Sequence, residues 1–389
     1  MKIFDKINSI VKKKRCTLLG VGPMSKNVID ASINISNKKN FPLILIASRR
    51  QIDSKEFGGG YVENWDTETY SKYVKKRIKN DNLIMARDHG GPWQNNKEIE
   101  LKLNINDAMK SSKRSFACDI DCGFKILHLD PSLSISGSQP KQDVVLKRIF
   151  ELYEYCWDYA RSKKKEIIFE IGTEEQSGST NSDYELEYTL SEMHKFCKKN
   201  KLPPVSFVVI QAGTKVMELE NVGSFESHTR IKDEIPVEIQ LLRMIEICNK
   251  NNVLMKEHNT DYLSNDSLNW HPKLGIHSAN VAPEFGVSET KALLRLFADC
   301  NMNKEKDIFL KIAYESGKWK KWMIKNSKSD DLKKSIISGH YVFSNKKVLQ
   351  LKDKLRVKLK KRKIDLDKLL VNEIEKSITR YTSAFKLSH

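Results

Sequence analysis

The sequence predicts an α/β protein, a (β/α)8 TIM barrel that is followed by a helical, basic C-terminal extension. Apolar runs of strand length alternate eight times with stretches of helical periodicity, which is the order of elements in a parallel barrel. Polar residues follow the apolar runs at one end, and strand signals cease near residue 304. We therefore expect the barrel and an N-terminal helix in residues 1–303 and the extension in residues 304–389.

The expected elements follow one another in a regular order. An amphipathic segment with Ile3, Ile7, Ile10 and Val11 predicts the N-terminal helix. The expected strands span residues 16–21, 42–47, 83–86, 125–130, 166–171, 205–210, 252–256 and 274–281. The expected helices span residues 25–36, 67–79, 98–122, 144–162, 184–199, 237–250 and 287–299. Since parallel strands need helical crossovers, this alternation favours a barrel surrounded by helices.

A doubly wound open sheet is the main structural alternative. Such sheets usually carry a glycine-rich dinucleotide turn after the first strand, whereas Gly20-Val21-Gly22-Pro23 lacks the rest of that motif. The chain has no repeat of fixed period and no linker rich in proline or serine. We therefore favour one barrel over an open sheet with a second domain.

Composition limits the cellular setting. The chain has 389 residues, of which 39% are hydrophobic, and no apolar stretch approaches the roughly 18 residues of a membrane span. The segment Met1–Lys6 lacks the apolar core of a secretory signal, so we expect a cytoplasmic protein without a membrane partner. The seven cysteines are scattered and are expected to be reduced; Cys118 and Cys122 alone make a weak zinc motif.

Half of the net charge of +18 lies in one short segment. Residues 346–363 hold ten Lys or Arg and one acid, Asp353, which gives +9. Such a run can bind nucleic acid or an anionic membrane surface, or it can be a solvated helix, which we favour. No aromatic residue is interleaved to stack on bases, which argues against a nucleic-acid partner. A phosphorylated or acidic small substrate fits the general basicity equally well.

Reactive side chains gather where the expected strands end. The octet Ala86–Trp93 places Asp88 and His89 directly between an apolar run and a Gly-Gly-Pro turn. His128, His258 and His277 also fall at expected strand ends, and the carboxyl ends of barrel strands form the substrate-binding face. Imidazoles with nearby carboxylates suit a divalent transition metal, zinc above all. Since no local His-x-x-x-His spacing is present, the alternative is four separate structural histidines.

Further polar residues at these strand ends are candidates for binding substrate. We select Arg49, Gln51, His128, Asp130, Ser136, Gln211, Asp261 and Asn280. The adjacent Arg49 and Arg50 could bind a phosphate or carboxylate in a bidentate manner, or form ion pairs at the surface. Glu174, in the loop after the fifth strand, could move a proton.

Six segments together resemble a known family. They are Phe57–Tyr61, Arg87–Gln94, His128–Ser132, Ile171–Glu174, Glu257–Tyr262 and Val281–Pro283. In this order they resemble the tagatose-bisphosphate aldolase non-catalytic subunit family, which is related to the class II aldolases. The resemblance runs from about Ala47 to Phe297 and implies a TIM barrel.

The resemblance also implies roles for individual residues. In catalytic class II aldolases the histidine of a similar Asp-His pair binds zinc, and the aspartate transfers a proton. By this resemblance Asp88 is the acid or base, with Glu174 as a second candidate. His89 and His258 become metal ligands, and the third ligand is open among His128, His277 and Glu174, with His277 preferred.

Departures from the family pattern indicate a different substrate. Asn280 stands before Val281-Ala282-Pro283, where the family tends to carry a lysine, and Arg49-Arg50 stands where it usually has an acid. We expect a metal-dependent, class II aldolase-like lyase that acts on a phosphorylated ketose or a related sugar. The alternatives are a non-catalytic subunit that stabilises a separate tagatose-bisphosphate-type aldolase, self-association included, and a sugar epimerase. Lys256 is the one lysine near a strand end, so a Schiff-base aldolase is less favoured.

Overall fold

Eight parallel strands close into a barrel, as the sequence predicts. The computed structural model describes residues 3–135, 140–172, 182–226 and 236–388. The strands are β1 (Leu18–Val21), β2 (Leu43–Ser48), β3 (Leu83–Gly90), β4 (Ile126–Leu129), β5 (Ile168–Ile171), β6 (Phe207–Ile210), β9 (Leu254–Glu257) and β10 (Ser278–Val281). Their order around the barrel is β1-β10-β9-β6-β5-β4-β3-β2. The (β/α)8 fold is therefore confirmed.

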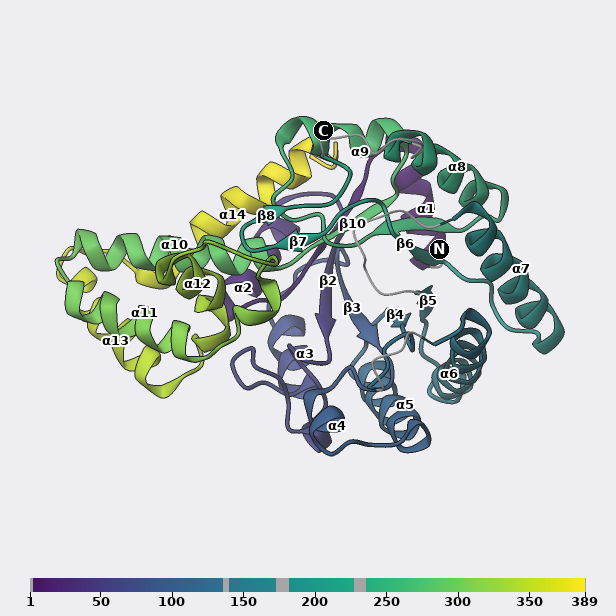
Figure 1. Cartoon of the computed structure of the whole chain (residues 1–389), viewed down its shortest axis with the longest axis horizontal. Coiled ribbons are helices and arrows are strands. Elements are labelled where there is room, and N and C mark those ends of the chain that lie inside the picture. Colours follow the sequence, from purple (N-terminus) through teal and green to yellow (C-terminus); the bar gives the residue numbers. More distant parts are fainter. Residues whose placement is uncertain (1–2, 136–139, 173–181, 227–235, 389) are drawn as a thin grey trace.

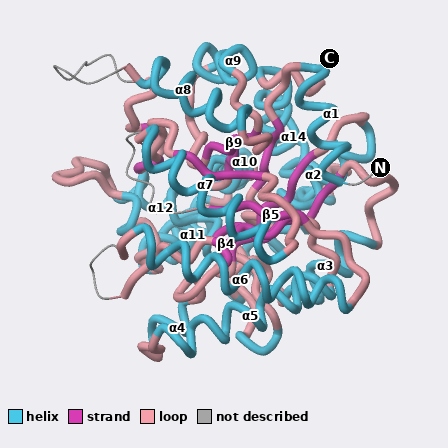
Figure 2. The backbone as a smooth tube through the Cα atoms, turned by 90° about the vertical axis from the view of Figure 1, so that its right-hand side faces the viewer, coloured by secondary structure: helices cyan, strands magenta, loops and turns pink. Residues whose placement is uncertain are grey.

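Helices surround the barrel, and Figure 2 shows the strands enclosed by them on all sides. They are α1 (Ile3–Lys14), α2 (Lys26–Lys38), α3 (Thr67–Lys75), α4 (Asn96–Glu100), α5 (Ile105–Asp121), α6 (Gln142–Ser162), α7 (Asp183–Asn200), α8 (Val237–Lys250), α9 (Asn265–Leu274) and α10 (Pro283–Asp299). Several begin at a side-chain cap: Ser25, Asp66, Asn104 and Ser264 each accept a bond from a backbone N–H of the first turn.

The strands form because their apolar residues are buried on both faces, inside the barrel and beneath the helices. The β2 residues Leu43–Ala47, for example, are all at most 2% exposed. Helix α9 was not expected from the sequence, since it buries only three residues and contains Pro272. The small hairpin of β7 (Val216–Met217) and β8 (Glu220–Asn221) was not expected either.

The C-terminal extension is helical, as expected, and packs beside α10. Its elements are α11 (Asn303–Glu315), η2 (Lys320–Trp322), α12 (Asp331–Ser338), η3 (Gly339–Val342), α13 (Lys346–Lys360) and α14 (Leu366–Ala384). In Figure 1, α11, α12 and α13 form a separate lobe, whereas α14 (yellow) returns along α2 to the barrel. The lobe has its own apolar core, which includes Phe297, Phe309 and Leu355. Phe385 then accepts a backbone bond from Thr17 of the β1 segment at 3.1 Å.

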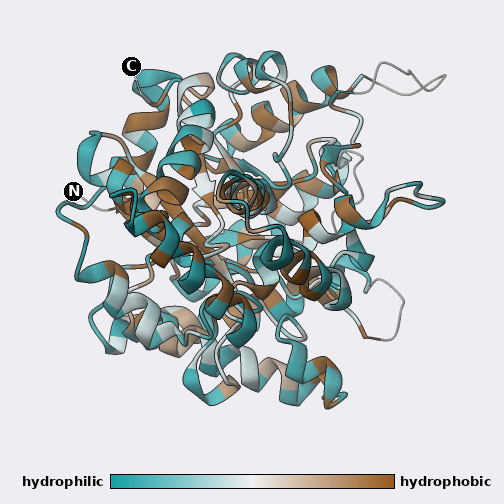
Figure 3. Cartoon of the chain, turned by 90° about the vertical axis from the view of Figure 1, so that its left-hand side faces the viewer, coloured by the Kyte–Doolittle hydropathy of each residue, from teal (hydrophilic) through white to brown (hydrophobic). Residues whose placement is uncertain are grey.

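The basic run coincides with α13. Its apolar face, with Leu351 and Leu355, is buried in the lobe, and most of its cations lie on the other face. Figure 3 shows hydrophilic and hydrophobic colours along the same helices, as amphipathic elements require. This arrangement agrees with the favoured interpretation of the run as a solvated helix. No helix in the described part of the chain combines the length and apolar character needed to cross a membrane.

Candidate metal centre and active-site pocket

A bulge in β3 turns two adjacent side chains toward the same site. The pairing of β3 with β4 shifts register between Arg87 and Gly90, and His89 has the left-handed φ of 43°. In a regular strand Asp88 and His89 would face opposite sides of the sheet. The bulge removes that constraint, and His89 Nε2 lies 3.9 Å from Asp88 Oδ2.

The residue before this pair anchors the bulged strand. Arg87 is buried and makes two bonds, of 2.5 and 2.7 Å, to the carboxylate of Asp119 on α5. It also donates to the backbone oxygens of Ala47 and Ile52, at 2.8 and 2.7 Å. Arg87 thereby links β3 to α5 and to the carboxyl end of β2 with the turn that follows it.

Four ligand atoms from four strand ends converge beside the bulge. They belong to Asp88, His128, Glu170 and His258, and all lie within 4.8 Å of one another. His128 Nδ1 is 3.6 Å from both Asp88 Oδ1 and Glu170 Oε1. His258 Nε2 is 3.8 Å from the same Asp88 oxygen and 3.4 Å from the same Glu170 oxygen. Two imidazoles and two carboxylates thus form a candidate metal-binding cluster.

The geometry of this cluster fits a divalent cation. Zinc bonds to nitrogen and oxygen are about 2.0–2.2 Å long, so tetrahedral ligand atoms lie about 3.4 Å apart. The four separations above match that spacing and are long for hydrogen bonds between the same groups. The backbone N–H of His89 donates to His128 Nδ1 at 3.2 Å, so this nitrogen is an acceptor and carries no proton, which is the form of an imidazole nitrogen that binds metals.

The cluster carries an excess of negative charge. Burial raises the pKa of Glu170, but Lys256, at 2.6 Å from Oε2, and His128 outweigh burial and lower it to about 2. Burial likewise opposes ionisation of Asp88, yet the charge of His89 and the nearby His128 hold its pKa well below the usual range. Burial lowers the pKa of His258, which favours the neutral imidazole that metals bind.

His89 stands beside the cluster and is held by Asp130. Its Nδ1 lies 2.6 Å from Asp130 Oδ2, which also accepts from Gln94 Nε2 at 3.2 Å. Burial opposes protonation of His89, but Asp88 and Asp130 outweigh it and raise its pKa to about 9. The rings of His89, His128 and His258 have centroids 5.0–5.3 Å apart. With 35% of its side chain exposed, His89 is the most accessible of the three.

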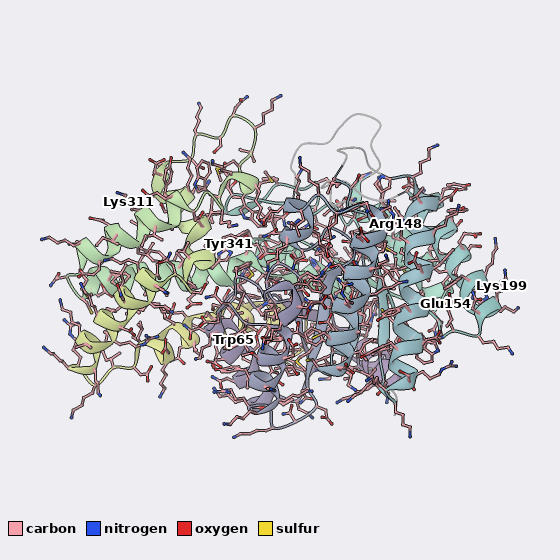
Figure 4. All side chains as sticks on the ribbon, turned by 90° about the horizontal axis from the view of Figure 1, so that it is seen from below. Trp65, Arg148, Glu154, Lys199, Lys311 and Tyr341 are labelled. Atoms are coloured by element: carbon pink, nitrogen blue, oxygen red, sulfur yellow. The ribbon has the colours of Figure 1, made fainter. Side chains whose placement is uncertain are left out.

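A pocket of about 560 Å³ opens over Asp88 and His89. Its lining also includes Gln51, Gln94, Tyr61, Trp322, Tyr341 and five cations, Arg49, Arg50, Lys97, Lys318 and Lys321. Trp322 and Tyr341 belong to the extension, and Figure 4 shows Tyr341 where the extension meets the barrel. The pocket therefore joins the cluster to a cationic wall that both parts of the chain supply.

The family model described as D-tagatose-1,6-bisphosphate aldolase subunit GatZ/KbaZ-like matches residues 5–384. The chain belongs to this family. No curated protein sequence matches it significantly. The resemblance inferred from the six sequence segments is thus confirmed over nearly the whole chain.

Solved structures share the fold at low sequence identity. A probable tagatose 6 phosphate kinase from Sinorhizobium meliloti 1021 is similar with a TM-score of 0.78 at 15% identity, covering 95% of this chain and 100% of that one. Fructose-bisphosphate aldolase from Campylobacter jejuni gives 0.57 at 13%, covering 99% and 94%. The fructuronate-tagaturonate epimerase UxaE from Cohnella laeviribosi gives 0.52 at 11%, covering 97% and 86%. At these identities the likeness shows the fold alone.

The structure brings many of the candidate residues of this GatZ/KbaZ-like chain together. Those in or beside the cluster and pocket are Asp88, His89, His128, His258, Asp130, Gln51 and Asn280. Asn280 Nδ2 lies 3.5 Å from Asp88 Oδ1, and Gln51 lines the pocket. Sequence reasoning did not select Glu170, although an acid that closes an apolar run at a strand end is the signal that would have found it.

Other candidates lie elsewhere. His277 precedes β10 and so sits at the amino end of the barrel, where its Nδ1 accepts from the backbone N–H of Met255 at 2.9 Å. The expectation that it joins the metal ligands is therefore wrong: the strand begins one residue after His277, so its side chain cannot reach the carboxyl rim. The preferred third ligand is replaced in the cluster by His128 and Glu170.

Arg49 and Asp261 are both paired with other groups of the protein. Arg49 lines the pocket, but its guanidinium forms ion pairs with Asp53 at 2.8 Å and with Glu98 at 2.7 Å. Asp261 Oδ1 accepts from the backbone N–H groups of Ala282 and Glu284 at the start of α10. Gln211 is buried directly after β6. Glu174 and Ser136 lie outside the described residues.

Proposed function

We propose that this protein is a metal-dependent lyase of the class II aldolase type that acts on a phosphorylated ketose or a related sugar. The observation that carries the proposal is the four-ligand cluster at the carboxyl end of the barrel, open to a pocket with cationic walls. A cation there would offset the buried carboxylates, and the cationic wall would attract an acidic sugar derivative. Family membership supports a role in aldolase chemistry.

The proposed metal ligands are Asp88, His128, Glu170 and His258. Two imidazoles among the four favour zinc over magnesium or calcium, which prefer oxygen ligands throughout. When bound, such an ion supplies Lewis-acid polarisation of the substrate carbonyl. Lys256 would hold Glu170 in place through their 2.6 Å ion pair.

His89 is the proposed proton-transfer group. Cleavage of the carbon–carbon bond requires that a proton leave the hydroxyl on the far carbon of that bond, which becomes a carbonyl, while the electron pair of the bond passes to the carbon beside the original carbonyl and is then protonated. Asp130 holds His89 Nδ1 at 2.6 Å, which leaves Nε2 for the substrate, and His89 lines the pocket. Ser132 and Gln94 hold Asp130 in turn. This proposal exchanges the roles that the family resemblance implied, with Asp88 as ligand and His89 as acid or base.

An accessory role is the second candidate, because the family description is that of an aldolase subunit. In that case the partner would be a separate catalytic aldolase subunit or another copy of this chain. A scaffold, however, has no need of two buried carboxylates that converge with two imidazoles, and burying them costs free energy. An epimerase would use the same cluster and the same proton-transfer group, and differs only in the bond that is broken.

Metal analysis combined with a turnover assay tests the proposal. The wild type is expected to bind about one metal ion per chain and to cleave a ketose phosphate to two carbonyl products. His258→Ala is expected to lose both properties, whereas the matched control His277→Ala keeps the metal. A wild type without bound metal and without turnover of ketose phosphates would favour the accessory role. Retained metal with interconversion of two sugar epimers would favour the epimerase.

A further inference from the structure

Two cations that line the pocket, Arg50 and Lys321, form no ion pair with any residue in the described part of the chain. We propose that Arg50 of the barrel and Lys321 of the extension form a subsite for the phosphate group of the substrate. This inference rests on the proposed function, since it assigns the part of the pocket that would hold the non-reacting end of the same substrate. Nothing in the ligand cluster is needed for it, so the two proposals can fail separately.

Arg50 differs sharply from the arginine before it. Arg49 is fully engaged by two carboxylates, whereas Arg50 makes no ion pair with a described residue and its Nε is buried without a partner. A guanidinium that is largely removed from water without a counter-ion is costly to fold. A bound anion would satisfy it, and the planar fork of arginine matches two phosphate oxygens.

Lys321 reaches the same pocket from the extension. Its ammonium lies over the rings of Trp322, at 4.5 Å from the centroid, and Tyr341, at 5.4 Å. It forms no ion pair with a described residue. The Tyr341 hydroxyl accepts from Trp322 Nε1 at 3.2 Å, which leaves its own proton free to donate to a ligand.

The two cations also repel each other in the absence of a ligand. Partial removal from water and the nearby charge of Arg50 lower the pKa of Lys321 to about 8. Burial similarly lowers the pKa of Arg50. Like charges brought together on two separate elements are stabilised when an anion lies between them. Lys97 and Lys318 add positive charge along the pocket. The acidic residues of its lining are Asp88 and Glu100.

The subsite bridges two parts of the chain that are far apart in sequence. Arg50 lies in the turn after β2, and Lys321 lies in η2 of the extension. Both the barrel turn and the extension therefore determine which substrate binds. This gives the extension a role in specificity beyond its packing on α10.

Titration calorimetry with inorganic phosphate tests the subsite. The full-length protein is first treated with a chelator so that no metal binds the phosphate, and low ionic strength is kept to limit screening. We expect Arg50→Gln and Lys321→Gln each to weaken phosphate binding about tenfold or more, the loss of one charged bond. Lys320→Gln, a change at the adjacent lysine outside the pocket lining, is expected to bind like wild type.

Three results would overturn the subsite. They are no phosphate binding by the wild type, equal binding by wild type and Arg50→Gln, and acetate binding as tight as phosphate, which would assign a carboxylate instead. Partial recovery in Arg50→Lys supports the charge as the cause, with thermal melting showing that each variant is folded. His258→Ala is expected to keep phosphate binding, so failure of the metal proposal leaves this result unchanged.

Discussion

The two ends of the barrel use histidine differently. At the carboxyl end His89, His128 and His258 lie ring to ring within 5.3 Å and share three carboxylates, those of Asp88, Glu170 and Asp130. At the amino end His277 accepts from a backbone N–H and forms no ion pair with a carboxylate of a described residue. Histidine thus lies in a candidate metal-binding and proton-transfer site where carboxylates converge, and in a structural position where they do not.

The largest expected effect separates proton transfer from metal binding at the carboxyl end. We expect His89→Ala to lower kcat by about 10²–10⁴ while the metal content stays that of the wild type, since His89 is outside the ligand cluster. Steady-state kinetics and metal analysis of the same sample measure both. Loss of the metal would instead restore His89 as a ligand and contradict the exchange of roles.

Removal of a carboxylate ligand tests the cluster itself. We expect Glu170→Gln to weaken metal binding at least about 100-fold. Loss of a residue that only hydrogen-bonds to a metal ligand would have a smaller effect. Competition with a chromophoric chelator measures the affinity. The control is Glu166→Gln, at the amino end of the same segment, where the carboxylate accepts from the backbone N–H of Ile3 at 2.6 Å. Equal affinity in Glu170→Gln and wild type would remove Glu170 from the site.

Metal removal is expected to lower the melting temperature. An ion that binds the folded state alone stabilises it by about 2.7 kcal/mol at a hundredfold excess over its Kd. Addition of a chelator should therefore lower the Tm of the wild type by several degrees but leave that of His258→Ala unchanged. Differential scanning calorimetry measures both, and an equal shift in the two proteins would show that the chelator acts elsewhere.

The smallest effect concerns acid stability at the amino end. Burial, with a lesser effect of Lys12, lowers the pKa of His277 to about 4. Between about pH 6.5 and pH 4 the unfolded chain binds a proton at this position and the folded chain does not, so stability falls as the pH falls. His277→Asn, which keeps an acceptor for Met255, should reduce the loss between pH 7 and pH 5 by up to about 2 kcal/mol. Urea unfolding at pH 7 and pH 5 measures it; an unchanged difference would contradict the assignment.

The sequence identified much of the site but not the roles within it. Asp88, His89, His128 and His258 could be selected because each lies within three residues of an apolar run, which is a local pattern. The exchange between Asp88 and His89 depends on the bulge between Arg87 and Gly90, and no local pattern predicts a register shift against β4. Arg49 forms ion pairs with two carboxylates, whereas Arg50 forms none with a described residue. This difference likewise depends on tertiary contacts.

The sequence alone determined the (β/α)8 fold and the end of the barrel that carries most of the reactive side chains. Periodicity and strand length are properties of short segments, and they limit how such segments can pack. Only the tertiary structure decided that His277 faces away from the site and that Lys321 and Tyr341 approach Arg50. Strand register and long-range packing set those positions, because both depend on partners in other elements of the chain, from Met255 for His277 to the distant η2 segment for Arg50.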